Sequence, residues 1–131
     1  MIDIENEVVS RISAALPKGT YVTSEYVSAP AVFPHVSVVE MDNYTLKATQ
    51  TQELTENHAV LTYEINIYSN LKNGKKAQCK ALAAAADTAM QKMGFTRISL
   101  QPVQNILDGT IYRMTGRYTA AVATDKTIYR R

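Results

Sequence analysis

An alternating pattern in residues 58–69 constrains the fold of this chain more than any other feature. Its apolar side chains share one parity: Leu61, Tyr63, Ile65 and Ile67. Its polar side chains share the other: Thr62, Glu64 and Asn66. Because successive side chains of a strand point to opposite faces, this pattern predicts a strand with one buried and one solvated face. Such strands are typical of antiparallel sheets.

Residues 110–123 predict a second long strand of the same kind. Its apolar parity holds Tyr112, Met114, Tyr118, Ala120 and Val122. Its polar parity holds Arg113, Thr115, Arg117 and Thr119. Gly116 in the middle indicates a bulge or bend. Shorter strands are expected near residues 21–23, over 35–42, over 95–100 up to a break at Pro102, and in the tail 126–131.

Two segments predict helices. Residues 3–15 carry apolar side chains at helical spacing, Asp3 is placed to cap the start, and Pro17 and Gly19 follow the end. Residues 73–93 are rich in alanine, and Gly94 is placed to end that helix. The apolar stripe of this second helix comprises Cys79, Leu82, Ala86, Met90 and Met93.

The order of these elements predicts the fold class. Strands follow one another instead of alternating with helices, which indicates an α+β fold. We expect a mainly antiparallel sheet with the N-terminal helix and the central alanine-rich helix packed on it. Residues 1–131 should form one domain, since the chain shows no linker or repeat. Residues 43–57 are polar and rich in threonine, so they form either an exposed hairpin or a mobile arm.

Composition limits the class of protein. Apolar residues make up 46% of the chain and charged residues 20%, which is the range of globular domains. A single cysteine excludes an internal disulfide framework. No apolar run approaches the roughly 20 residues that a membrane span requires. The first residues lack the basic and apolar parts of a signal peptide. A soluble protein of a reducing compartment is expected.

The net charge of +2 hides an uneven distribution. Residues 1–66 hold three basic and nine acidic side chains, a net charge of −6. Residues 67–131 hold eleven basic and three acidic ones, a net charge of +8. Either the folded protein has surfaces of opposite charge, suited to head-to-tail association of copies, or the two halves interleave and their charges mix.

The residues that carry catalysis or bind metals form no known motif. His35 and His58 each begin a predicted strand and lack a metal-ligand spacing. Cys79 belongs to the apolar stripe, where a free cysteine acts as a small hydrophobic residue, although its place early in the helix would lower its pKa slightly. Lys75 and Lys76 follow Asn73-Gly74 at a helix start, without the spacing of a phosphate-binding loop. We therefore expect no enzyme, no metal and no cofactor.

Two stretches carry a resemblance to a known family. The strand at residues 63–70 leads into the helix that ends at Met93-Gly94-Phe95, and the chain closes on the strand R-Y-T-A-A-V at residues 117–122. In this pattern, which covers nearly the whole chain, the sequence resembles the small neck and tail-completion proteins of long-tailed bacteriophages and prophages. Among them it is most similar to the tail terminators.

The resemblance implies an α+β fold and a structural role in the virion. Tail terminators assemble as rings, typically hexamers, on the end of the growing tail tube. The ring stops polymerisation of the tube protein and offers a surface to the head connector, and DNA passes through its channel without sequence-specific binding. The implied location is the tail–neck region of the virion, after assembly in the host cytoplasm, with no membrane partner.

Two alternatives stay open beside the tail terminator. One is a head-completion, connector or other minor neck protein of a phage. The more distant one is a small nucleic-acid-binding module that uses Lys72, Lys75, Lys76, Lys80, Arg113 and Arg117. The residues expected at a contact between subunits or with a partner are Lys47, Gln50, Gln52, Lys75, Lys76, Arg130 and Arg131.

Overall fold

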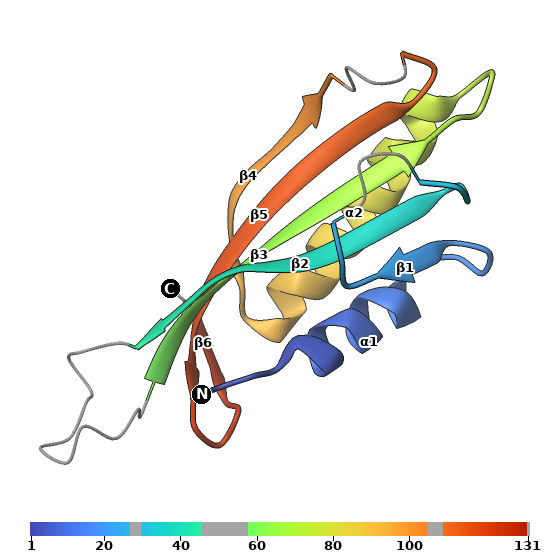
Figure 1. The fold of residues 1–131 in the computed structure, drawn as a ribbon. Helices are drawn as coiled ribbons and strands as arrows, with labels where there is room; N and C mark the ends of the chain where they lie inside the picture. The colour runs from blue at the N-terminus through green and yellow to red at the C-terminus, as the bar shows by residue number, and fades with distance from the viewer. Residues whose placement is uncertain (27–29, 46–57, 105–108, 131) are drawn as a thin grey trace, which may run out of the picture.

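A six-stranded sheet forms the centre of the protein in a computed structural model that describes residues 1–26, 30–45, 58–104 and 109–130 (Figure 1). The strands are β1 Tyr21–Thr23, β2 His35–Thr45, β3 His58–Ser69, β4 Thr96–Val103, β5 Tyr112–Ala123 and β6 Ile128–Arg130. Their order is β1-β2-β3-β5-β4, and β6 pairs with the last part of β5. All pairs are antiparallel except β1 with β2. The predicted α+β class is confirmed.

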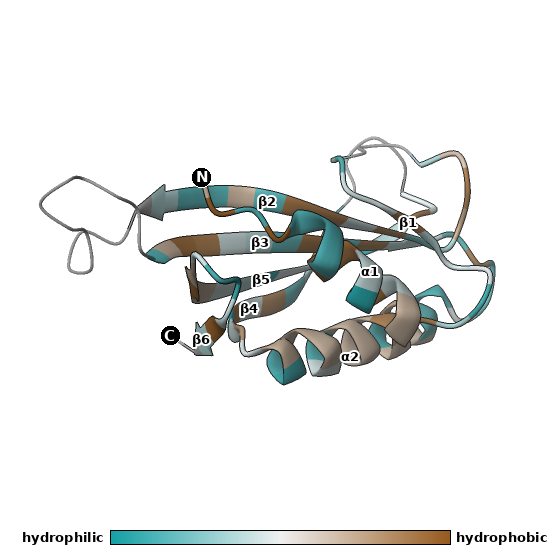
Figure 2. Ribbon diagram, turned by 90° about the horizontal axis from the view of Figure 1, so that it is seen from below, coloured by the Kyte–Doolittle hydropathy of each residue, from teal (hydrophilic) through white to brown (hydrophobic). Residues whose placement is uncertain are grey.

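Helices α1 (Glu5–Ala15) and α2 (Lys75–Met93) lie on the same face of the sheet (Figure 2). All five side chains of the predicted stripe of α2 are buried. Helix α2 ends at Gly94, which has φ +107° and whose N–H donates to the carbonyl of Gln91. A Cβ at Gly94 would lie 3.1 Å from Ile128 Cγ2, so conformation and space both favour glycine there.

The core fills the space between the helices and the sheet. The apolar parities predicted for β3 and β5 both supply it, with the partial exception of Tyr112, which is half-buried. Helix α1 contributes Val8 and Ile12. Its N-cap is Ile4 and not the predicted Asp3, although the Asp3 carboxylate accepts from the Glu5 N–H at 3.0 Å. Phe95 meets Tyr63 edge to face, with ring centroids 5.6 Å apart.

Two predictions about the strands are wrong. Pro102 does not end β4, which continues to Val103, because β4 is the outer strand on its side and proline is tolerated at a sheet edge. Gly116 forms no bulge with β3, where the register is continuous; the irregularity lies in β4, between Arg97 and Ser99. Gly116 instead makes room, since a Cβ there would lie 3.1 Å from the Tyr118 ring.

The other predicted segments agree in outline. Strand β2 begins at His35 as expected and runs on to Thr45, and β6 forms the predicted last strand. Of the polar segment 43–57, residues 43–45 belong to β2, and the rest lies outside the described residues. No helix of the described chain is both long and apolar enough to cross a membrane.

Candidate interaction face

Three cross-strand rows of side chains occupy the sheet face that points away from the helices. Each row runs across the paired strands in register. The first row is Tyr21, His35, Tyr68, Arg113 and Val103. The second is Thr23, Ser37, Asn66, Thr115 and Gln101. The third is Val39, Glu64, Arg117 and Ser99. We call these rows the polar face.

The polar face is not the solvated surface that the alternation in β3 predicts. Asn66 is fully buried and Glu64 is 7% exposed. Strands β1 and β2 are parallel neighbours, so the chain between them has to return to the starting end. Figure 2 shows the described parts of this connection, residues 24–26 and 30–34, on the side opposite the helices. The described side chain of Tyr26, within it, lies over Arg113.

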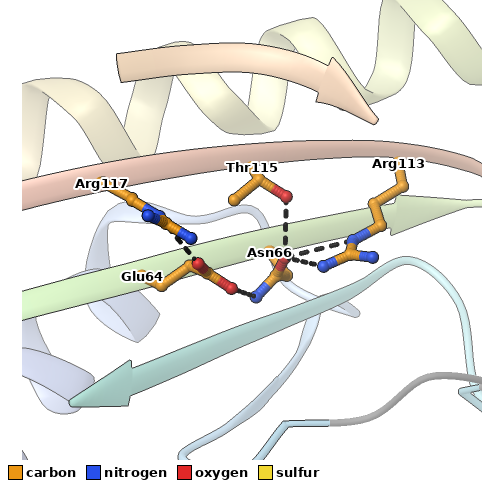
Figure 3. A network of polar contacts seen from close by, with 5 residues as sticks. All are labelled: Glu64, Asn66, Arg113, Thr115 and Arg117. Carbon is orange, nitrogen blue, oxygen red and sulfur yellow. Dashed lines mark hydrogen bonds and ion pairs between the residues drawn. The ribbon is translucent and has the colours of Figure 1, made fainter. Parts of the chain in front are cut away.

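Asn66 is the centre of a hydrogen-bond network (Figure 3). Its Oδ1 accepts from Arg113, with Nη2 at 2.6 Å and Nε at 3.1 Å, and from the Thr115 hydroxyl at 2.8 Å. Its Nδ2 donates to Glu64 Oε1 at 3.0 Å. One amide therefore joins two polar residues of β5 to a buried carboxylate of β3.

The other oxygen of Glu64 is paired with Arg117. The Arg117 Nε donates to Glu64 Oε2 at 3.0 Å, and the Arg117 side chain is 53% exposed. The network thus contains two guanidinium groups and one carboxylate, a net charge of +1. The acceptor of Arg113 is the neutral amide of Asn66, and Arg113 forms no ion pair within the described residues. The polar face therefore has an excess of positive charge.

Aromatic rings hold the Arg113 guanidinium in place. Its Cζ lies 5.6 Å from the centroid of Tyr68 and 5.6 Å from that of Tyr26. Both distances are within the range of cation–π attraction. Tyr68 is fully buried, whereas Tyr26 is half exposed. A shallow groove of about 320 Å³ lies next to these groups, with Gln101 of β4 and Arg117 of β5 among its walls.

Three carboxylates gather on the other side of the molecule. Asp3 and Glu5 lie at the start of α1, and Glu40 lies near the middle of β2, in register with the core residue Tyr63. Burial raises the pKa of Glu40, and the negative charges of Asp3 and Glu5 raise it further. We call Asp3, Glu5 and Glu40 the acidic end. None of the three forms an ion pair in the described part of the chain, although Lys126 borders the same hollow as Asp3.

The two halves of the sequence interleave in the sheet, yet their charges do not fully mix. Strand β3 of the acidic half pairs with β5 of the basic half, and Glu64 meets Arg117 there. The polar face nevertheless keeps its excess cation. The acidic end lies on the side of the helices, since Glu40 accepts from the hydroxyl of the core residue Tyr63 at 3.4 Å. Arg113 and Arg117 therefore lie on one side of the sheet and the acidic end on the other. Lys75, Lys76 and Lys80 of α2 share the helix side with the acidic end, and Asp42, opposite Thr62, lies on the side of the polar face.

The expected contact residues are only partly described. Lys47, Gln50, Gln52 and Arg131 lie outside the described residues. Arg130 belongs to β6, whose pairing is defined. Lys76 is exposed at the start of α2, and the Lys75 Nζ donates to the carbonyl of Thr110 at 3.3 Å.

The basic residues of the nucleic-acid alternative do not share one surface. Lys75, Lys76 and Lys80 belong to α2, on the helix side of the sheet, and Arg113 and Arg117 lie on the polar face. Sequence reasoning did not find the polar face as a site.

His35 and Cys79 are packing residues. His35 lies between Tyr21 and Tyr68, its Nε2 is 2.9 Å from the Thr23 hydroxyl, and burial lowers its pKa. Cys79 is fully buried, and its Sγ donates to the carbonyl of Tyr112 at 3.3 Å. Burial raises its pKa to about 12, which corrects the slight lowering expected from its place in the helix. The described residues contain no group of His, Cys, Asp and Glu that could hold a metal ion.

The buried thiol leads to a first prediction. At pH 8, native Cys79 should react with a disulfide reagent such as DTNB at least about a hundredfold more slowly than in the unfolded chain, because little thiolate forms and the sulfur is covered. Absorbance at 412 nm, followed with and without denaturant, measures both rates. Rapid reaction of one thiol per native chain would contradict the buried position.

Comparison with known proteins adds no family. No protein-family model matches the chain, and no curated protein matches it. Any functional conclusion therefore depends on the residues themselves and on the resemblance already described.

Proposed function

We propose that this chain is a structural protein of a phage tail, a tail terminator that acts as a subunit of a ring. The observation that carries the proposal is the opposition of two surfaces. The polar face has an excess of positive charge, and the acidic end lies on the other side of the sheet. A ring of identical subunits needs such a heterologous contact, in which one surface meets a different surface of the next copy.

The fold agrees with what the resemblance implies. A tail terminator is expected to be an α+β protein with a sheet flanked by helices, and this chain has that architecture. In the proposed mechanism, a ring, of six copies by analogy, occupies the growing end of the tail tube. The ring blocks addition of further tube protein by steric exclusion and presents its opposite side to the head connector. DNA passes through the channel without base-specific contacts.

Elongation of tail tubes tests the proposal directly. The folded chain, added in excess over tube ends to tubes growing from the tube protein of the same genome, should stop the increase in mean length. Electron microscopy of negatively stained tubes measures this length, and gold-labelled chain should mark one end of each tube. The heat-unfolded chain is the control. Tubes that keep lengthening in the presence of the folded chain would refute the proposed role.

The same experiment separates the tail terminator from its neck relatives. A head-completion or connector protein should bind the portal end of the head and leave tube growth unchanged. Gene order gives an independent check, because a tail terminator gene is expected just upstream of the gene for the major tube protein. A neighbourhood of metabolic genes would contradict both phage roles.

A further inference from the structure

We infer that the polar face of one copy binds the acidic end of a second copy, with Arg117 as the principal contact. This inference deepens the proposed function and rests on it in one respect, that copies of the chain associate. It names the two surfaces that meet and the chemistry that joins them, a guanidinium group against a cluster of carboxylates.

The Arg117 guanidinium can bind a second carboxylate in addition to Glu64. Only its Nε is used by Glu64, at 3.0 Å, and 53% of its side chain is exposed. The terminal nitrogens of an arginine remain able to donate when Nε is engaged, and they match the spacing of carboxylate oxygens. The groove beside it offers further polar groups, Ser99 and Gln101 of β4. These side chains suit a rim of hydrogen bonds around the charged contact.

Arg113 is a positioning residue for this surface. It donates to the Asn66 amide, and its Cζ lies 5.6 Å from the ring centroid of Tyr26 and 5.6 Å from that of Tyr68. Its charge lacks a carboxylate partner among the described residues, so it adds to the positive potential of the groove without being free to move. A fixed charge attracts a partner with less loss of side-chain entropy than a mobile one.

The acidic end has the complementary property. Asn43 Nδ2 donates to the carbonyl of Ile2 at 2.8 Å and to Glu40 Oε1 at 3.4 Å, so Glu40 lies beside the residues that precede α1. The charges of Asp3 and Glu5 raise the pKa of Glu40 in this position. A cation from another copy would relieve this repulsion. Lys126 borders the same hollow as Asp3, and it makes no ion pair among the described residues. Attraction of this kind steers association and weakens with salt.

The geometry makes the contact heterologous. The acidic end lies on the helix side of the sheet and the polar face on the opposite side, so these two surfaces of one copy cannot meet each other. A two-fold contact would need both surfaces within one patch, so that each copy offers both, and surfaces on opposite sides of the sheet do not form one patch. Repeated head-to-tail contacts instead close into a ring or continue as a filament.

Two variants test the inference on the full chain. Variant A carries Asp3→Asn, Glu5→Gln and Glu40→Gln, which remove the acidic end but keep its hydrogen-bonding oxygens. Variant B carries Arg117→Gln, which removes one exposed guanidinium group from the polar face. Lys80→Gln is the matched control, because it removes one exposed positive charge from α2. Circular dichroism and thermal melting establish that each variant is folded.

Sedimentation velocity at low salt distinguishes the outcomes. The parent and the Lys80→Gln control should associate with rising concentration, and A and B alone should each associate about tenfold more weakly. An equimolar mixture of A and B should form dimers and nothing larger, because the polar face of A still meets the acidic end of B. Raising the salt concentration should weaken association of the parent.

Several results would overturn the inference. These are a parent that stays monomeric at millimolar concentration in low salt, folded A or B that associates like the parent, and a mixture of A and B that stays monomeric. If variant B is unfolded, two other single changes in the groove replace it, Ser99→Arg and Gln101→Glu. Ser99→Arg should strengthen association and Gln101→Glu should weaken it. Unchanged association in both variants would refute the contact. If the variants associate as expected but the chain does not stop tube growth, the contact between copies stands and the proposed function is refuted. If the chain stops tube growth but the variants do not associate as expected, the proposed function stands and this contact is refuted.

Discussion

Replacing Asn66 with alanine should lower the free energy of unfolding by about 3 kcal/mol, a large part of the roughly 5–15 kcal/mol that stabilises a domain. The side chain is fully buried and makes hydrogen bonds to Arg113, Thr115 and Glu64. Its removal leaves a guanidinium and a carboxylate that have each lost a buried partner, and such groups cost more than neutral ones. Chemical denaturation followed by circular dichroism measures the change.

Thr62→Ala is the matched control for this variant. Thr62 lies on the same face of β3 but is only half-buried, and no hydrogen bond joins its side chain to the described residues. Its replacement should cost less than about 1 kcal/mol, the range of strand preferences alone. Equal losses for the two variants would show that the network adds nothing to stability beyond the propensity of the strand.

The burial of Asn66 marks the limit of what the sequence predicts. Alternation of side chains in β3 and β5 identifies the strands and the parity that faces the core, because that parity is apolar in both. It does not predict which strands pair. Asn66 and Thr115 are 49 residues apart in the chain, so neither segment shows by itself that its polar parity has a partner.

A signal for the network is nevertheless present in the sequence. Glu64 stands opposite Arg117 and Asn66 opposite Thr115 in the β3–β5 register. Opposite charges and hydrogen-bonding side chains favour direct cross-strand neighbours, so matching these residues gives the correct antiparallel register. The sequence does not predict that residues between β1 and β2 cover part of the polar face, because this segment contains prolines and has no periodic pattern. The contact of Tyr26 with Arg113 is a purely tertiary feature.

The sequence predicts that the first half of the chain is acidic, but it does not predict where these charges lie in the fold. The sequence predicts that acids gather in the first half of the chain and bases in the second. Pairing of β3 with β5 brings Glu64 to Arg117 and so consumes one carboxylate of the acidic half. Among the described residues of that half, the carboxylates that form no ion pair are Asp3, Glu5, Glu25, Glu40 and Asp42. Asp3, Glu5 and Glu40 are the ones that form the acidic end. Fold topology, not composition, decides which charges stay available to a partner.

Tyr68 should show that its ring stabilises the polar face while its hydroxyl does not. Tyr68→Ala should lower the free energy of unfolding by about 3–5 kcal/mol, as expected for loss of a fully buried aromatic ring. Arg113 would also lose one of the two rings that flank its guanidinium. By contrast, the Tyr68 hydroxyl is buried without a hydrogen-bond partner in the described structure. Tyr68→Phe should therefore leave stability unchanged or raise it, because the cost of burying an unpaired hydroxyl disappears.

Tyr118→Phe is the control that separates the two contributions. The Tyr118 ring is equally buried, but its hydroxyl donates to Asp87 Oδ1 at 2.8 Å, and Asp87 also pairs with Arg97. Loss of that hydroxyl should cost about 1–2 kcal/mol, since the acceptor is charged. Denaturant titrations of the two phenylalanine variants measure the contrast. If Tyr68→Phe lowers the free energy of unfolding as much as Tyr118→Phe does, the Tyr68 hydroxyl has a hydrogen-bond partner. The description of the groups around Arg113 would then be wrong.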